Sequence, residues 1–166
     1  MIILAIDPGY ARVGMAILSR EDGKDVLLYS SCLTTDKVLQ HAGRLSQIGE
    51  EVRRLITRYK ANSLALERLF FNTNQRTALA VSEARGVIIF AAREAGLEVF
   101  EYTPLQVKIA VTGYGRSTKQ QVASMVARLI ELPQSPGRRE DDEIDAIAVG
   151  LTHFAVFREH ITHPGH

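Results

Sequence analysis

The sequence predicts an α/β domain on a mixed sheet, in which an antiparallel meander joins parallel strands and helices flank both. Three observations carry this prediction. Residues 2–6 form a continuous aliphatic run, which is typical of a central strand covered on both faces. Residues 13–19 and 26–33 form two further strand patterns around the turn 20–24, which predicts a meander. Apolar runs then alternate with helical patterns, which predicts parallel strands.

The middle of the chain supplies the alternating elements. Residues 37–59 carry apolar side chains at helical spacing and predict an amphipathic helix. Residues 63–67 form a short apolar strand that ends on an acid. The strongly apolar helix 77–95 leads into a strand at 97–101.

Two helices are expected near the carboxyl end. Ser117 and Gln120 have the spacing of a capping box, which predicts a helix that runs to about Glu131. A loop with proline and glycine then precedes a last helix near residues 140–157.

Length and composition indicate one globular domain. The chain has 166 residues, of which 46% are hydrophobic and 23% charged, and we expect a single domain over residues 1–158 with a flexible tail at 159–166. The net charge of +1 does not exclude nucleic acid as a partner. The single Cys32 forms neither a redox pair nor a zinc site, and no apolar run reaches membrane-spanning length. These features predict a cytoplasmic protein without a membrane partner.

Acidic side chains end two of the predicted strands. Asp7 follows the run 2–6, and Glu67 ends the strand 63–67. Parallel neighbours bring their carboxyl ends together, where open α/β sheets usually carry their ligands. We therefore expect the two carboxylates to converge.

The last helix adds two more acids. Asp142 and Asp145 are three residues apart, so they share one helix face beside apolar residues that must pack on the sheet. Carboxylates gathered in this way repel one another unless cations neutralise them. Oxygen ligands alone favour Mg²⁺ or Mn²⁺ over zinc. Two such ions could hydrolyse a phosphodiester, which points to nucleic acid as the substrate.

Simpler interpretations exist for each acid alone. Asp7 could be a turn residue, and Glu67 could pair with Arg68 or Arg85. Interaction with the helix dipole accounts for the first-turn acids Glu140, Asp141 and Glu143 without catalysis. It does not account for Asp145, which lies deeper in an apolar run. The coincidence of three elements favours a joint site.

An ordered set of motifs extends from Ile2 to His153. Together they resemble the RuvC family of Holliday-junction resolvases. The motifs are IDPG with a following VG, Glu67-Arg68-Leu69-Phe70, Glu83-Ala84-Arg85-Gly86, Gln106-Val107-Lys108, GYGRSTKQQV and DEIDAIAVGLTH. The resemblance implies an RNase H-like fold, a five-stranded mixed sheet flanked by helices.

The resemblance also implies a function. The family resolves four-way DNA junctions by paired symmetric nicks in recombination and repair, using two Mg²⁺ ions for which Mn²⁺ can substitute. Its four acidic ligands match Asp7, Glu67, Asp142 and Asp145. Asp141 is an alternative to Asp142 in a shifted register. His153 matches a family position and is interpreted as a supporting or structural residue.

The resemblance assigns DNA contacts as well. Phe70 matches a phenylalanine that stacks on bases, and Lys108 and Lys119 match basic positions near the cut phosphate. Phe71 fits either base stacking or packing onto its own domain. Arg76, Tyr114 and Arg116 are further candidate contacts on nearby polar segments.

The family acts as a homodimer, in partnership with the branch-migration complex RuvAB. Helix 77–95 has more apolar coverage than one buried stripe needs, and Gly86 would allow another helix to approach closely. The alternative is a helix buried wholly in its own domain. Two rival functions are a YqgF-like nuclease for ribosomal RNA precursors and a non-catalytic junction-binding protein.

Overall fold

The computed structural model describes residues 1–68, 75–133 and 139–157, apart from the side chains of residues 75–77. Its centre is a five-stranded sheet in the order β3-β2-β1-β4-β5. Strands β1, β2 and β3 pair antiparallel, whereas β1 pairs parallel with β4 and β4 pairs parallel with β5. The predicted mixed sheet is therefore confirmed. The strands are β1 (Ile2–Asp7), β2 (Arg12–Glu21), β3 (Lys24–Thr34), β4 (Ser63–Glu67) and β5 (Glu98–Tyr102).

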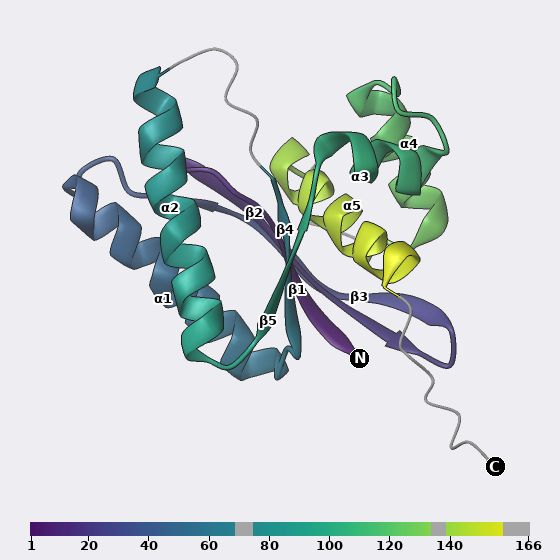
Figure 1. Cartoon of the computed structure of the whole chain (residues 1–166), viewed down its shortest axis with the longest axis horizontal. Helices are drawn as coiled ribbons and strands as arrows, with labels where there is room; N and C mark the ends of the chain where they lie inside the picture. The colour runs from purple at the N-terminus through teal and green to yellow at the C-terminus, as the bar shows by residue number, and fades with distance from the viewer. Residues whose placement is uncertain (69–74, 134–138, 158–166) are drawn as a thin grey trace.

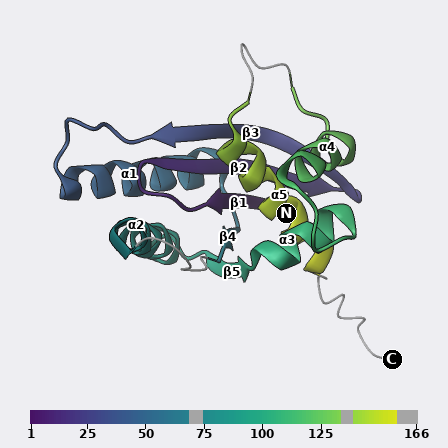
Figure 2. The same ribbon diagram turned by 90° about the horizontal axis from the view of Figure 1, so that it is seen from above.

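Helices cover both faces of the sheet (Figures 1 and 2). One pair, α1 and α2, covers one face, and α3, α4 and α5 lie on the other. The helices are α1 (His41–Tyr59), α2 (Gln75–Glu94), α3 (Pro104–Thr112), α4 (Lys119–Leu129) and α5 (Asp141–Val156). Within the described residues, no helix combines the length and the apolar character needed to cross a membrane.

Strand β1 is the rigid centre of the fold. Its residues 3–6 are fully buried because helices lie over both faces. Successive side chains of a strand point to opposite faces. Accordingly Leu4 and Ile6 join the core below α1 and α2, whereas Ile3 and Ala5 join the core below α5. Burial on both faces of the strand therefore explains the continuous aliphatic run in the sequence.

Helix α3 was not expected from the sequence. Thr103 caps it by accepting a hydrogen bond from the Gln106 backbone, the Gln106 side chain accepts one from the Thr103 backbone, and Pro104 opens the first turn. Gly113 ends the helix with φ of 76°, a left-handed conformation that glycine adopts without strain. The Thr-Pro-x-Gln signal was present in the sequence, but the helix is only nine residues long.

The predicted cap of α4 is wrong by one residue. Thr118, not Ser117, is the N-cap, and its partner in the capping box is Gln121, not Gln120. Both pairs have the same spacing, so the sequence alone did not distinguish them. Ser117 is instead buried, with its hydroxyl in hydrogen bonds to Thr112 and to the Tyr114 carbonyl.

Helix α5 packs against the sheet at very short range. A β-carbon on Gly150 would lie 2.4 Å from a methyl group of Leu18 and 3.2 Å from the β-carbon of Ala5. Residues 146–154 of the helix are all buried. This close approach fixes the helix over β1 and β2 and thereby places its acidic first turn at the end of β1.

Candidate active site

Asp7 and Glu67 end two neighbouring parallel strands. Ile6 of β1 is paired with Leu66 of β4, so the next residue of each strand lies at the same edge of the sheet. Both acidic residues are half-buried. The predicted convergence of the two strand ends is confirmed.

A glycine admits α5 to this edge. Gly14 of β2 is the pairing partner of Asp7. A β-carbon on Gly14 would stand 1.8 Å from the carbonyl oxygen of Asp142, so only glycine leaves room for the start of the helix. The backbone of Asp142 thus lies one strand away from Asp7.

Burial and neighbouring carboxylates raise the pKa of Asp7 and of Glu67. Burial, followed by the charges of Glu67, Asp145 and Asp142, raises the pKa of Asp7 from 3.8 to about 8. Burial and the charge of Asp145 raise the pKa of Glu67 from 4.5 to about 7. The acids of α5 therefore lie within electrostatic range of Asp7, and Asp145 lies within range of Glu67 as well.

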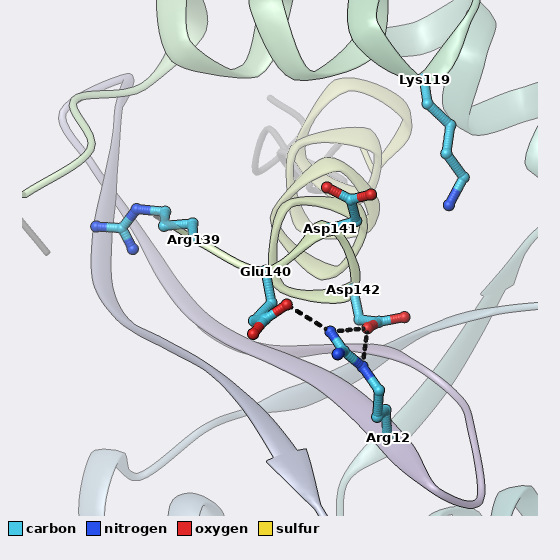
Figure 3. Close-up of a pocket in the computed structure, with 6 residues that line it drawn as sticks. All are labelled: Arg12, Lys119, Arg139, Glu140, Asp141 and Asp142. Atoms are coloured by element: carbon cyan, nitrogen blue, oxygen red, sulfur yellow. Dashed lines mark hydrogen bonds and ion pairs between the residues drawn. The ribbon is translucent and has the colours of Figure 1, made fainter. Parts of the chain in front are cut away.

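Asp142 and Asp145 of α5 each have a basic partner. Arg12, at the start of β2, donates to Asp142 from Nε at 2.7 Å and also to Glu140 from Nη2 at 2.8 Å (Figure 3). Lys119, at the start of α4, donates to Asp145 at 3.0 Å. Sequence reasoning missed Arg12. Its position five residues after Asp7, at the far side of a tight turn, was the available signal.

The four carboxylates have the chemistry expected of ligands for a divalent cation. All four are oxygen ligands, which Mg²⁺ and Mn²⁺ prefer. Within the described residues, no three side chains of His, Cys, Asp or Glu stand close enough to hold one ion as placed. Asp142 and Asp145 instead take Arg12 and Lys119 as partners. The raised pKa values of Asp7 and Glu67 indicate that negative charge is unfavourable at this edge without a cation to neutralise it.

Arg85, one alternative partner for Glu67, has a different partner. Arg85 is in an ion pair with Glu101 on β5. The nearby charges that lower the pKa of Glu67 are those of Lys119 and Lys108. Lys108, on α3, is half-buried. Two basic residues assigned by resemblance to DNA thus lie within electrostatic range of Glu67.

Only some of the other DNA contacts predicted from the sequence lie within the described residues. Tyr114 is 58% exposed, and Arg116 is exposed on the same loop between α3 and α4. Phe70 and Phe71 lie outside the described residues, as does the side chain of Arg76. The structure therefore places Tyr114 and Arg116 on the surface and leaves the other three as predictions.

Glu143 corrects one sequence interpretation. Its place in the first turn predicts interaction with the helix dipole alone, but Glu143 is buried and ion-paired. Arg139 donates to its carboxylate at 2.6 Å, and the Ser30 hydroxyl of β3 donates to the same oxygen. Arg139 also binds the Pro133 carbonyl. This network ties the start of α5 to the edge strand, one residue from Asp142.

His153 belongs to the core rather than to the carboxylate edge. It is fully buried, and its Nδ1 shares a hydrogen bond of 2.8 Å with the Tyr102 hydroxyl. Its ring stacks on Phe157 and meets Phe100 edge-on. Burial lowers the pKa of His153 to about 4, so the ring is neutral. Asp141, by contrast, is exposed on the first turn of α5.

Comparisons with known proteins agree on one family. A family model described as "Crossover junction endodeoxyribonuclease RuvC" matches residues 3–153. The protein of that name from Moorella thermoacetica is 46% identical over 161 residues, which cover 96% of this chain and 95% of the relative. The one from Ruminiclostridium cellulolyticum is 42% identical over 153 residues, which cover 92% of this chain and 91% of the relative.

Solved structures give the same result. Thermus thermophilus RuvC in complex with a Holliday junction substrate superposes with a TM-score of 0.85 at 32% identity, over 93% of each chain. The structure titled "Thermus thermophilus RuvC structure" gives a TM-score of 0.82, again at 32% identity, over 93% of this chain and 94% of the other. The yeast mitochondrial Holliday junction resolvase Ydc2 shares the fold at 16% identity, with a TM-score of 0.66 over 92% of this chain and 78% of the other.

Proposed function

The chain belongs to the RuvC family of crossover junction endodeoxyribonucleases, and we propose that it resolves four-way DNA junctions by hydrolysing one phosphodiester bond in each of two opposed strands. The observation that carries the proposal is the meeting of Asp7, Glu67 and the first turn of α5 at one sheet edge, within the segment that matches the family. The product is a pair of symmetric nicks in DNA recombination and repair.

Asp7, Glu67, Asp142 and Asp145 are the catalytic metal ligands in this proposal. Asp142 and Asp145 are now paired with Arg12 and Lys119, and they would have to leave these ion pairs to act as metal ligands. Two Mg²⁺ ions, for which Mn²⁺ can substitute, would supply activation of water and stabilisation of the leaving oxygen. The buried core of β1 and β4 holds Asp7 and Glu67 in fixed positions, so little reorganisation precedes the reaction.

Basic and aromatic residues around this edge bind the DNA. Lys108 and Lys119, near Glu67, hold the phosphate that is cut. Tyr114 and Arg116 extend the contact along the exposed loop between α3 and α4. The remaining proposed contacts are Phe70, Phe71 and Arg76, with Phe70 stacking on bases at the junction centre.

The protein is proposed to act as a homodimer through α2. Leu79 and Phe90 are 66% and 62% exposed, and Glu83 and Gly86 between them are exposed on the same stripe. A β-carbon on Gly86 would meet nothing within 4 Å, so another helix has room to approach. A two-fold dimer presents two equivalent sites to a substrate of near two-fold symmetry. RuvAB is the proposed partner complex and the cytoplasm the proposed compartment.

One experiment tests the proposal. A mobile four-way DNA junction is incubated with the chain in Mg²⁺, in parallel with Asp7→Asn and with an RNA hairpin as a second substrate. We expect symmetric nicks in the junction from the unmodified chain and binding without cleavage from Asp7→Asn. Cleavage of the hairpin but not the junction would favour a YqgF-like nuclease. Junction binding without metal-dependent cleavage by the unmodified chain would favour a scaffold.

A further inference from the structure

Arg12 has no assigned contact with the DNA in the proposed reaction, yet it binds a proposed metal ligand directly. Its guanidinium contacts Asp142 at 2.6 Å and Glu140 at 2.8 Å. On the proposed function stated above, we propose that Arg12 is a further DNA-phosphate contact of the active site, held by Asp142 until a divalent ion takes that carboxylate. Arg12 then serves first as an internal counter-ion and afterwards as a substrate contact.

The geometry implies that Arg12 and a divalent ion would compete for Asp142. Both Nε and Nη2 of Arg12 approach the same oxygen, Oδ2. An ion bound through Oδ2 would need the lone pairs that the guanidinium now occupies, and an ion bound through either oxygen would repel the guanidinium at close range. Glu140, which is 58% exposed, is then the only described ion-pair partner left to Arg12.

The turn before β2 fixes Arg12 in this place. A β-carbon on Gly9 would lie 1.9 Å from the Arg12 carbonyl oxygen, so the chain turns back tightly after Asp7. The side chain of Arg12 is 43% exposed and extends toward Asp142 and Glu140 (Figure 3). The guanidinium is therefore available to solvent-side ligands as well as to the two acids.

A pocket of about 580 Å³ lies where this exchange would occur. It is lined by Arg12, Lys119, Arg139, Glu140, Asp141 and Asp142. Arg139 points away from the other five in Figure 3, and its guanidinium binds Glu143 and Ser30. Among the lining residues, Arg12 and Lys119 are thus the cations that bind Asp142 and Asp145.

Arg12 and Lys119 have corresponding positions beside the two proposed metal ligands of α5. Each binds one acid of α5, Arg12 taking Asp142 and Lys119 taking Asp145. A guanidinium matches a phosphate with two parallel hydrogen bonds, which a lysine cannot form. Once the acids are neutralised, a DNA phosphate is the anion that enters this space. Arg12 is therefore suited to orient the phosphate and Lys119 to add charge.

Metal binding without DNA gives the first test. Mn²⁺ affinity is measured by calorimetry for the unmodified chain, for Arg12→Gln and for Arg53→Gln. Arg53 is a matched control because it forms a similar exposed ion pair, to Glu94 at 2.9 Å, on the helices of the opposite face. We expect Arg12→Gln to bind Mn²⁺ about two- to five-fold more tightly, the range of one exposed ion pair, and Arg53→Gln to be unchanged.

The sign of this change decides between the roles. If Arg12 only aligned Asp142, its removal would weaken Mn²⁺ binding, and that outcome or an unchanged affinity overturns the proposal. Absence of Mn²⁺ binding by the unmodified chain overturns the metal site and this inference together. Metal binding that is normal but insensitive to Arg12 overturns this inference alone.

Junction binding gives the second test. The salt dependence of affinity is compared for the unmodified chain and Arg12→Gln, using a junction with phosphorothioate linkages at its centre to slow cleavage. In Mg²⁺ we expect the slope of log affinity against log salt to be smaller by about 0.9 in Arg12→Gln, as for one lost phosphate contact. In EDTA the two slopes should be equal. Equal slopes in Mg²⁺, or a difference already present in EDTA, overturn the exchange.

Discussion

Gly14 and Asp142 are in contact through their backbones. A β-carbon on Gly14 would lie 1.8 Å from the Asp142 carbonyl oxygen and 2.5 Å from its carbonyl carbon. Because Gly14 pairs with Asp7 across the β1–β2 ladder, this contact sets the separation between the acid that ends β1 and the acids that begin α5. The geometry of the proposed metal site thus depends on a residue that carries no functional group.

Gly14→Ala is expected to damage both stability and the site. The new methyl group cannot be accommodated by a side-chain rotation, since the neighbouring atoms belong to the backbone of Asp142. We expect a loss of about 1–3 kcal/mol in the free energy of unfolding, as for overpacked cores. Cleavage, measured well below the unfolding temperature, should fall more than the folded fraction does, because Asp142 moves away from Asp7.

Gly43→Ala is the control for this substitution. Gly43 lies in α1, where a β-carbon would meet Leu39 at an ordinary 3.4 Å. The alanine should be neutral or slightly stabilising in a helix. Thermal unfolding curves of both variants provide the measurement, and equal stability of Gly14→Ala and the unmodified chain would contradict the close contact.

Asp7→Asn is expected to stabilise the metal-free chain at high pH. The pKa of Asp7 is about 8 in the folded chain, whereas an unfolded chain has a value of about 3.9. Between these values the folded state binds the Asp7 proton more than the unfolded state does, so the contribution of Asp7 to stability is greatest below about pH 4 and falls as pH rises to about 8. Asparagine carries no charge at any of these pH values and removes this decline.

Unfolding in EDTA at pH 5 and pH 8 measures the effect. At pH 8 we expect Asp7→Asn to exceed the unmodified chain by on the order of 2 kcal/mol, less than the full shift because Asp7 is only half-buried. The advantage should shrink at pH 5 and disappear when Mg²⁺ is added. Asp22→Asn, at an exposed turn between β2 and β3, is the control and should show no such gain. An advantage of Asp7→Asn that does not vary with pH would rule out this explanation.

Phe90→Glu is expected to convert the proposed dimer into a monomer. Phe90 is 62% exposed on α2, so the change should leave the fold of one chain intact. A charge at the centre of an apolar interface loses its hydration and opposes association. Light scattering should give twice 18.4 kDa for the unmodified chain and 18.4 kDa for the variant. Leu105→Glu on α3, where Leu105 is 56% exposed, should stay dimeric, and monomers from both variants would argue against α2.

The sequence predicted the features that depend on local pattern. The aliphatic run 2–6 and the strand 63–67 predicted the parallel pair that brings Asp7 and Glu67 together, because buried strands need apolar residues on both faces. Asp142 and Asp145 could be assigned to one helix because their spacing of three is a local property.

The features that depend on distant contacts could not be predicted. Arg12 and Asp142 are 130 residues apart, and their ion pair exists only because α5 packs on β2. Glu143 looked like an ordinary first-turn acid since its burial depends on Ser30 of β3, 113 residues away. The same limit affected Ser117 and Thr118, where two equal capping patterns compete and tertiary packing selects the second.

The buried pair Arg139–Glu143 should be essential for holding the start of α5. Both side chains are largely buried, at 14% and 11% exposure, and Arg139 also binds Ser30 and the Pro133 carbonyl. Arg139→Met leaves the Glu143 carboxylate without its positive partner, which costs about 3–5 kcal/mol for a buried ion. Ser30→Ala removes the two hydrogen bonds of the Ser30 hydroxyl but leaves the ion pair in place, and it should cost only about 1–2 kcal/mol.

A double-mutant cycle separates this pairing from the loss of packing. The variants are Arg139→Met, Glu143→Leu and the two together, each unfolded by urea. Because the double variant leaves no unpaired charge, we expect it to be more stable than Arg139→Met alone, with a coupling energy of about 1–3 kcal/mol. Additive losses would mean that the two residues stabilise α5 independently. Asp142 is adjacent to Glu143. Cleavage by the double variant therefore measures whether Asp142 keeps its position when α5 is stable but the Arg139–Glu143 network is absent.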